Sequence, residues 1–299
     1  MPELPEVEVI KLGLQKKITG LKIQKIQVLS PKSFIGNPNL AENKKILKIW
    51  RKAKILGMDL DGVTLLFHLK MSGQLVWMKT QNSNVKSQNY NSKLKTGDRF
   101  IGGHPTEDMI SNMPNAHTRV IFSFADGSRL YFNDQRKFGW VKIVDRLQVT
   151  GDNSLKNLGP EPLEESFTWQ ILKENLLKHK SQPIKVAIMD QSVVSGVGNI
   201  YGNEACFKAK LDPRTKVGDM GDQEFKAIHQ GVIRAIKDGI RYGGSTKAHF
   251  VDPEGHKGYF LDYAYVYWRD KHPCRVCGTE IKKISLGGRG TYFCPNCQT

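Results

Sequence analysis

Two patterns of hydrophobic and polar positions divide the chain. Between residues 18 and 144, short runs of β-branched and aromatic residues recur, separated by turn pairs such as Asp61-Gly62 and Asp126-Gly127. This pattern is typical of an antiparallel sandwich or barrel. The expected strands cover residues 22–29, 63–69, 75–78, 120–124, 129–132 and 140–144.

Helical periodicity marks the start of the chain and most of its second half. The expected helices cover residues 5–16, 163–178, 183–190, 199–209 and 222–241. Residues 79–114 are polar and lack periodicity, and they are too long for an ordinary hairpin loop. We therefore expect them to form an insertion that is either disordered or functional.

The order of these elements predicts an α+β protein with several domains. An N-terminal antiparallel β-sandwich domain is expected at residues 1–148, and the polar stretch that follows supplies a linker at 149–162. A helical domain is expected at 163–260, and a small cysteine-rich unit at 265–299. A chain of 299 residues is long enough for this organisation.

Charge narrows the class of partner. The net charge of +16 and the pI near 9.6 are too lopsided for an ordinary enzyme of small metabolites, and they favour a polyanion. Membrane-surface binding is the competing use of such charge. The sequence has no apolar run near 18 residues and no secretory signal at its start. We therefore expect an intracellular protein with no membrane partner.

Four of the five cysteines lie close together near the end of the chain. Cys274 and Cys277 form one Cys-x-x-Cys pair, and Cys294 and Cys297 form another after 16 intervening residues. This spacing is typical of a zinc ribbon in which four thiolates hold one structural Zn²⁺. His272 lies nearby but is expected to be a loop residue, and Cys206 is expected to be a buried spectator.

The expected hairpin between the two cysteine pairs has a cationic tip. Its polar and aromatic side chains are Lys282, Lys283, Arg289 and Tyr292. They suit contact with nucleic acid, but zinc ribbons also mediate contacts between proteins.

The first six residues could bring a reactive amine beside carboxyl groups. Removal of Met1 would leave Pro2 as the N-terminus, and a secondary amine condenses with a sugar aldehyde carbon to give a cationic iminium. An unperturbed α-amino group has a pKa of roughly 8, so it needs little activation at neutral pH. Glu3 could donate a proton to a leaving group. The alternative is that Pro5 and the acids around it only start a helix.

Four segments carry residues suited to DNA. Gly196 and Gly198 permit close backbone approach to an anion, and Asn199 could cap the helix that follows, although a plain helix–helix turn is the alternative. Cations gather in residues 51–54, and the residues at 68–73 and 133–139 are expected in loops. Met71 and Phe138 are the kind of wedge that separates stacked bases, unless they are core side chains.

Taken together, these motifs resemble the formamidopyrimidine-DNA glycosylase family, which also contains endonuclease VIII. The resemblance rests on Met-Pro-Glu-Leu-Pro-Glu, His-Leu-x-Met-Ser-Gly, Gly-Val-Gly-Asn-Ile-Tyr and the cysteine pairs, which occur in the expected order along nearly the whole chain. It implies a β-sandwich, a helical domain with a helix-two-turns-helix motif and a zinc finger, with damaged duplex DNA gripped between them. It also implies a bifunctional glycosylase and lyase that excises oxidised purines by a Schiff base, followed by β- and δ-elimination, without a redox cofactor.

The resemblance also implies roles for particular residues. Pro2 would be the nucleophile and Glu3 the general acid, whereas Lys54, Asn199 and Arg289 would act at the phosphates beside the lesion. The residues that would fill the DNA helix are Met71, Arg136 and Phe138. His68, Lys70 and Lys137 lie in the same loops and are expected to contact DNA. Residues 246–260 would close over the everted base.

The chain departs from the family pattern in a few places. Lys70 and Trp268 occupy positions where Gly is usual, Lys137 stands where a second Arg is frequent, and the 79–114 segment lies outside the resemblance. Leu4 favours the oxidised-purine branch. Two rivals remain open, an endonuclease VIII-like preference for oxidised pyrimidines and a DNA-binding module without catalysis. The expected state is a monomer in the bacterial cytoplasm, associated with the nucleoid.

Overall fold

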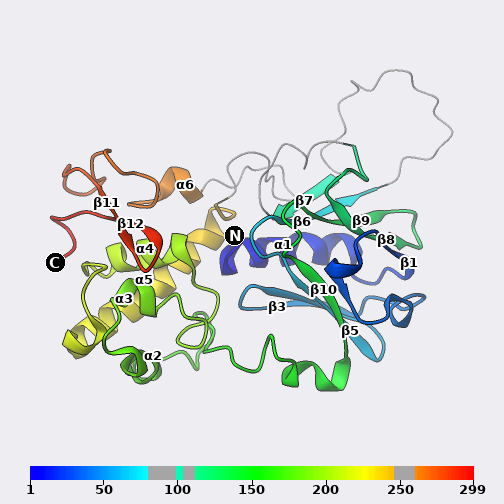
Figure 1. Cartoon of the computed structure of the whole chain (residues 1–299), viewed down its shortest axis with the longest axis horizontal. Coiled ribbons are helices and arrows are strands. Elements are labelled where there is room, and N and C mark those ends of the chain that lie inside the picture. The colour runs from blue at the N-terminus through cyan, green and yellow to red at the C-terminus, as the bar shows by residue number, and fades with distance from the viewer. Residues whose placement is uncertain (80–98, 104–111, 246–259) are drawn as a thin grey trace.

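Two five-stranded sheets form the first part of the protein (Figure 1). The computed structural model describes residues 1–79, 99–103, 112–245 and 260–299. One sheet has the order β1-β8-β9-β6-β7 and the other β2-β10-β5-β4-β3. The strands are β1 (Ile23–Val28), β2 (Phe34–Ile35), β3 (Lys48–Lys52), β4 (Ile55–Asp59), β5 (Val63–His68), β6 (Gly73–Met78), β7 (Arg99–Gly103), β8 (Thr118–Phe124), β9 (Arg129–Asp134) and β10 (Trp140–Asp145). The expected antiparallel sandwich is confirmed, apart from a short parallel pairing of β2 with β10.

Helix α1 (Leu4–Ile18) covers the open side of the sandwich, where the edge strands β3 and β7 lie. The fit is close, because a Cβ at Gly13 would lie 2.1 Å from the Phe100 ring, and one at Gly102 would lie 2.3 Å from Ile10. Most of the apolar residues of α1 join the sandwich core, but Leu4 belongs to the core of the helical part. The first helix therefore packs into two hydrophobic cores.

Helices form the second part of the protein, and they surround a separate core. They are α2 (Trp169–Leu176), α3 (Ile184–Ala187), α4 (Asn199–Lys208), α5 (Asp222–Arg241) and α6 (Phe260–Tyr263). The expected helix at 222–241 has the bounds of α5. The expected helices at 163–178 and 183–190 are too long, since Thr168 caps α2 by accepting a hydrogen bond from the Ile171 N–H, and α3 ends at Ala187.

A two-stranded hairpin, β11 (Lys282–Leu286) and β12 (Arg289–Phe293), ends the chain. Its buried face packs on Val266 and on Phe207 of α4. In Figure 1 this hairpin lies beside α4, and the N-terminus lies between the helical part and the sandwich. No described helix combines the length and the apolar composition that a bilayer crossing requires.

Strands β2, β3, β4 and β7 lie outside the strand ranges expected from the sequence. Strand β7 falls inside the span 79–114, so the interpretation of that whole span as an insertion is wrong for residues 99–103, which pair with β6. Residues 80–98 and 104–111 lie outside the described part of the chain. So does the expected lesion loop at 246–260, except for Phe260, which begins α6.

The strand registers bring three connections to one end of the sandwich. Ile55 pairs with His68, His68 pairs with Trp140, and Gly73 pairs with Asp134. The turn between β3 and β4, the β5–β6 connection and the β9–β10 connection therefore lie at neighbouring strand ends. These are the segments that carry the expected Lys54, Met71 and Phe138.

Candidate active site and zinc centre

Glu3 directly precedes α1, and its carboxylate lies at the N-terminus of α4, which belongs to the helical part. It accepts hydrogen bonds from the backbone N–H groups of Gly198 at 2.7 Å, Ile200 at 2.9 Å and Tyr201 at 3.4 Å. A helix N-terminus attracts negative charge, and here a side chain of the same protein supplies it. The expectation that Asn199 caps this helix is therefore wrong, because the N-cap position is Gly198.

The two glycines before α4 leave room for the start of the chain. A Cβ at Gly198 would lie 2.5 Å from the Glu3 carboxyl carbon, and one at Gly196 would lie 2.6 Å from the Leu4 Cβ. Gly196 also adopts φ +86°, and its carbonyl accepts a hydrogen bond from the Leu4 N–H at 3.0 Å. These contacts fix the backbone beside Pro2, which is itself buried.

Burial shifts the pKa values of two ionisable groups in the site, Glu3 and Tyr201. It raises the pKa of Glu3, although the charge of Lys54 and the backbone N–H donors act in the opposite direction. Glu6 accepts hydrogen bonds from the Glu3 N–H at 2.7 Å, the Tyr201 hydroxyl at 2.6 Å and the Ser245 N–H at 2.8 Å. Burial and the neighbouring Glu6 raise the pKa of Tyr201 well above its usual value, so Tyr201 remains a donor.

Lys54 extends from the sandwich toward the same loop. Its Nζ donates to the Val197 carbonyl at 2.8 Å, and burial lowers its pKa against the opposing effect of Glu3. Ala53, just before it, adopts φ +52° and donates its N–H to Glu161. Arg51 forms ion pairs with Glu8 at 2.9 Å and with Glu161 at 2.7 Å. The turn that carries Lys54 is thus held by the ion pairs of Arg51 and by the hydrogen bond from Ala53 to Glu161.

The amine at the chain start has a lowered pKa. With Met1 present, burial is the main cause, Lys54 and Arg289 act in the same direction, and Glu3 and Glu6 oppose them. An amine in these surroundings is less protonated at neutral pH than a free terminus would be. Met1 is 41% exposed whereas Pro2 is buried, so the first residue projects from the site that its successors form.

Lys185 is a site residue that the sequence did not reveal. It is fully buried, its Nζ donates to the Asn199 Oδ1 at 2.6 Å, and burial lowers its pKa to about 8. Asn199 in turn donates through Nδ2 to the Gly290 carbonyl at 3.2 Å, in the terminal hairpin. The only sequence signal was a lysine beside Ile184 at the start of an apolar helix, which carries no chemistry by itself.

The two loops expected to enter DNA both expose their large side chains. Met71 is 39% exposed and Phe138 is 57% exposed, so neither is a core residue. The Arg136 guanidinium carbon lies 5.2 Å from the centre of the Phe138 ring.

His68 has a pKa lowered to about 3, chiefly by burial, and its Nδ1 accepts a hydrogen bond from the Lys70 N–H at 3.0 Å. His68 is therefore neutral.

The departures from the family pattern fall in left-handed backbone. Lys70, Lys137 and Trp268 have φ of +50°, +59° and +58°, a region that Gly adopts without strain. Trp268 stacks on Tyr267 with ring centres 5.6 Å apart and remains 55% exposed. The turn before the hairpin is thus retained in spite of the Trp side chain.

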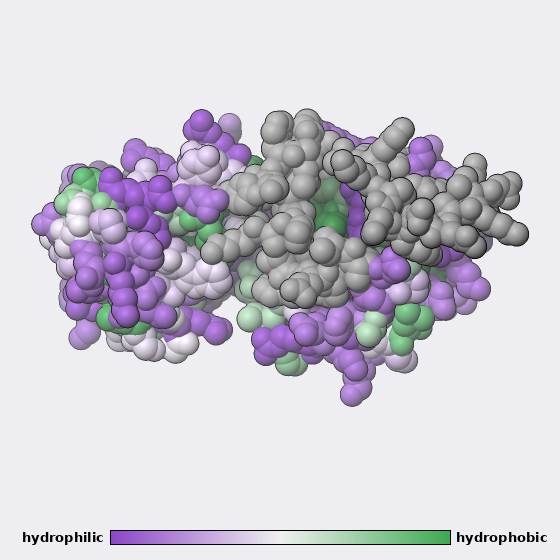
Figure 2. Space-filling view, turned by 90° about the horizontal axis from the view of Figure 1, so that it is seen from above, coloured by the Kyte–Doolittle hydropathy of each residue, from purple (hydrophilic) through white to green (hydrophobic). Residues whose placement is uncertain are grey.

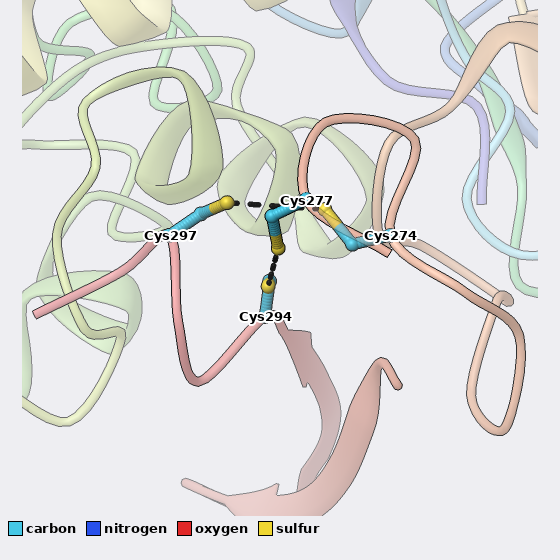
Figure 3. Close-up of side chains that lie close together, drawn as sticks. All are labelled: Cys274, Cys277, Cys294 and Cys297. Atoms are coloured by element: carbon cyan, nitrogen blue, oxygen red, sulfur yellow. Dashed lines mark hydrogen bonds between the residues drawn. The ribbon is translucent and has the colours of Figure 1, made fainter. Parts of the chain in front are cut away.

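The four clustered cysteines lie close enough together to hold a metal ion (Figure 3). Their sulfur atoms all lie within 4.8 Å of one another, with Cys274 and Cys297 at 3.9 Å and Cys277 and Cys294 at 3.4 Å. A Zn–S bond of about 2.3 Å in a tetrahedron gives sulfur separations of about 3.8 Å, so the cluster fits Zn²⁺.

The other two candidates near this chemistry are not part of the cluster. His272 is an exposed loop residue, as expected. Cys206 is fully buried, as expected, and burial raises the pKa of its thiol to about 12.

The hairpin is anchored to α4 by buried polar groups. The Tyr292 N–H donates to the Asn203 Oδ1 at 2.7 Å. The Glu204 carboxylate accepts from the N–H groups of residues 265, 266 and 267, each at 2.9 Å. Helix α4 therefore links Glu3 at its N-terminus to the metal unit along its side. Figure 2 views the molecule from above the orientation of Figure 1, and the described residues that it shows are mostly hydrophilic.

Comparisons with known proteins agree with this geometry. Three family models match, namely the formamidopyrimidine-DNA glycosylase N-terminal domain at residues 1–141, its H2TH domain at 158–251, and the zinc finger found in FPG and IleRS at 271–299. The first match runs through residues 79–114. The formamidopyrimidine-DNA glycosylase of Pelotomaculum thermopropionicum is 36% identical over 100% of this chain and 99% of its own length, and that of Listeria monocytogenes is 35% identical over 100% of both.

Solved structures show the same likeness. The MutM (Fpg) protein from Thermus thermophilus has a TM-score of 0.80 and 31% identity, over 99% of this chain and 98% of that one. The Lactococcus lactis Fpg in complex with DNA containing an abasic site has a TM-score of 0.83 and 28% identity, over 99% of both chains. With all three domain models, full-length relatives and the four-cysteine cluster in agreement, the chain belongs to the formamidopyrimidine-DNA glycosylase family.

Proposed function

We propose that the protein is a bifunctional DNA glycosylase and abasic-site lyase of base excision repair, which removes oxidised purines such as 8-oxoguanine and formamidopyrimidines from duplex DNA. The observation that carries this proposal is the position of Glu3, a carboxyl group with a raised pKa held at the N-terminus of α4 directly after Pro2. An acid of this kind, directly after the residue that becomes the N-terminal amine once Met1 is removed, suits the displacement of a base from a sugar.

In the proposed reaction, Met1 is removed and the Pro2 nitrogen attacks C1′ of the damaged nucleotide. The glycosidic bond breaks, the base leaves with the proton that the Pro2 nitrogen gives up, and Glu3 protonates the sugar oxygen as the ring opens to the iminium. The resulting iminium acidifies C2′, and loss of that proton expels the 3′ phosphate. A second elimination expels the 5′ phosphate, and hydrolysis of the imine returns the free amine.

DNA binding is assigned to the cations and amides around this site. We expect Lys54, Asn199 and Arg289 to contact the phosphates beside the lesion, with His68, Lys70 and Lys137 contributing further contacts. Met71, Arg136 and Phe138 would fill the space that the everted nucleotide leaves. Support comes from the exposure of Met71 and Phe138 and from the position of both loops at one end of the sandwich. The Lactococcus lactis relatives were solved with DNA that contains an abasic site or Fapy-dG.

One structural zinc ion is proposed at the four cysteines, where it would stabilise the hairpin and take no part in the reaction. We propose domain limits of 1–148 for the sandwich, 149–162 for the linker, 163–260 for the helical domain with a lesion loop at 246–260, and 265–299 for the zinc finger. The protein is expected to act as a monomer in the bacterial cytoplasm, on the nucleoid.

A trapping assay on a panel of lesions tests the proposal. Borohydride reduces an imine, so it should join the processed protein covalently to DNA that contains 8-oxoguanine, and mass spectrometry should locate the adduct on Pro2. If no lesion yields an adduct although the DNA is bound, the rival reading as a binding module without catalysis is correct. If thymine glycol is cut much faster than 8-oxoguanine, the preference is instead that of an endonuclease VIII.

A further inference from the structure

Asp134 is a fully buried carboxylate between the two loops that carry Met71 and Phe138. From the first loop, the Ser72 hydroxyl donates to the Asp134 Oδ1. From the second loop, the Arg136 N–H donates to the same oxygen at 3.2 Å and to the Ser72 Oγ at 3.0 Å, and the Gly139 N–H donates to the Oδ2 at 2.6 Å. One carboxylate therefore bonds to residues near both ends of the β9–β10 loop and to the last residue of the β5–β6 loop.

The backbone of Asp134 is fixed as firmly as its side chain. Its N–H donates to the His117 carbonyl at 2.9 Å, and its carbonyl accepts from the Arg119 Nε at 2.8 Å. Asp134 also ends β9 opposite Gly73, the first residue of β6. Its side chain is thus attached to the rigid sheet and reaches outward to the loops.

Close contacts constrain the bases of both loops. A Cβ at Gly139 would lie 3.1 Å from the Asp134 Oδ2 and 3.1 Å from the His68 carbonyl oxygen, and one at Gly73 would lie 2.4 Å from the Leu69 carbonyl oxygen. The Gly139 backbone thus lies against the end of β5, and the Gly73 contact tightens the β5–β6 connection itself. A side chain at either position would require neighbouring atoms to move.

Burying an ionised carboxylate is unfavourable unless donors replace the lost water, and the donors here are a hydroxyl and two backbone N–H groups. A hydrophobic residue could end the strand without this cost, so the carboxylate needs a role that a hydrophobic residue lacks. It is suited to hold the large exposed side chains in one arrangement before DNA binds. Side chains that are already ordered lose less entropy on insertion.

We propose that Ser72 and Asp134 are positioning residues that join the two loops into one rigid wedge, so that Met71, Arg136 and Phe138 enter the DNA together. The proposal rests on the proposed function, because it assumes that these three side chains displace a base. It assigns no chemical step to either residue. Without the Ser72–Asp134 contact, the wedge would form only after binding, and eversion of the base would be slow.

The test compares base excision from two substrates under single-turnover conditions. In one, the lesion is fully paired; in the other, a short mismatched bubble surrounds it, which removes most of the cost of unstacking. For Ser72→Ala we expect excision from the paired duplex to fall about tenfold, the size of effect that loss of a buried hydrogen bond can give, while excision from the bubble stays near the wild-type rate. A 2-aminopurine beside the lesion should report slower unstacking in the paired duplex alone.

The matched control is Ser128→Ala, at the other end of β9. Ser128 is also fully buried, and its hydroxyl donates to the Asp126 Oδ1 at 2.6 Å, but it lies in the turn between β8 and β9. This variant should leave the ratio of the two excision rates unchanged. Asp134→Asn serves as a second variant. Its amide N–H groups would face the N–H and O–H groups that donate hydrogen bonds to the carboxylate. It should therefore lower the ratio of the paired-duplex rate to the bubble rate further.

Borohydride trapping on abasic-site DNA keeps the two proposals separable. If the variants trap as well as wild type and only their paired-duplex rate falls, the wedge proposal stands. If Ser72→Ala and Asp134→Asn both fold, trap and keep the wild-type ratio of rates, the wedge proposal is overturned while the proposed function survives. If wild type itself does not trap, the proposed function fails first. Equal losses on both substrates, with a lowered melting temperature, would mean a purely structural role and would also overturn the wedge proposal.

Discussion

The Glu3 Oε2 lies 2.7 Å from the backbone nitrogen of Gly198, although the two residues are 195 positions apart in the chain. The general acid that we propose is thus held by backbone donors of the helical part, while the amine beside it belongs to the first residues of the chain. Neither part contains a complete site. The orientation of Glu3 depends on the docking of α1 against α4 and α5.

Replacement of Glu3 by Gln should separate the two activities. The amide cannot protonate the sugar oxygen, so we expect base release to fall by about 10² to 10⁴-fold. Cleavage at a preformed abasic site should fall less, because that sugar already equilibrates with its ring-opened aldehyde without the Glu3 proton. The raised pKa of Glu3 keeps it protonated to higher pH, so the wild-type rate should fall as pH rises through that pKa, and the Gln variant should lack this limb. Single-turnover rates across pH measure both effects. Glu42→Gln, in the sandwich, is the control.

Retention of Met1 should abolish covalent trapping. The reactive nitrogen would then lie one residue away from the site, as a primary amine on a partly exposed residue, and the Pro2 nitrogen would be an amide. Protein prepared with methionine aminopeptidase inhibited should bind DNA normally but give no borohydride adduct, and intact mass reports the extent of processing. Pro2→Gly, which is processed but lacks the secondary amine, should trap weakly. Full trapping by unprocessed protein would refute the assignment.

Lys185 should make stability depend on pH in a defined window. Its pKa is lowered from 10.5 to about 8 in the folded protein, so between these pH values the unfolded chain binds more protons than the folded one. The free energy of unfolding therefore rises with pH across this window. The gain is lost as pH falls through about 8. Lys185→Met lacks this dependence. Relative to wild type, its free energy of unfolding should therefore drop by about 2 kcal/mol from pH 7 to pH 10. Urea titrations measure the difference, and the exposed Lys180→Met should show none.

Removal of the metal should weaken DNA binding without unfolding the sandwich. The hairpin is held to α4 through Gly290 and Tyr292, so loss of its fold would also release Asn199 and Asn203. Chelation, or Cys297→Ser, should reduce affinity about tenfold or more, measured by fluorescence anisotropy. Cys206→Ala should retain one zinc per chain. Unchanged affinity in metal-free protein would contradict the proposed role of the finger.

Arg289 should account for one phosphate contact. Its loss in Arg289→Ala should reduce the slope of log affinity against log salt concentration by about 0.9. Arg214→Ala is the control, because its guanidinium is already paired with Asp212 and releases no counterion on binding. An equal change in slope for the two variants would remove Arg289 from the interface.

Local signals made much of this protein predictable. The spacing of Cys274, Cys277, Cys294 and Cys297 and the strong amphipathic pattern of α5 each depend on residues close in sequence. The edge strand β7 escaped prediction because it is short, contains Gly102 and Gly103, and is stabilised by distant contacts with α1, where Ile10 lies against Gly102 and Gly13 lies against Phe100. Strand β3 escaped because its cations Arg51 and Lys52 suggested a loop.

The remaining errors concern the site, where contacts are long-range. Asn199 was expected to cap α4, but Gly198 is the N-cap residue, and the N–H groups at this helix start donate to the carboxylate of Glu3, which is far away in the sequence. Lys185 has no local signature, since only the fold reveals that it is buried beside Asn199. The left-handed residues Lys70 and Trp268 could be located only by resemblance, because neither side chain favours that backbone.

Helix α1 belongs to two hydrophobic cores, through Leu4 on one side and the residues from Val7 to Ile18 on the other. Domains generally fold in order as the chain leaves the ribosome. This helix can dock against the sandwich early, but its leading turn has no partner until the segment around residues 196–201 has been synthesised. A chain released before that point would lack the backbone donors that hold Glu3, so under the proposed mechanism an incomplete chain should not cleave DNA.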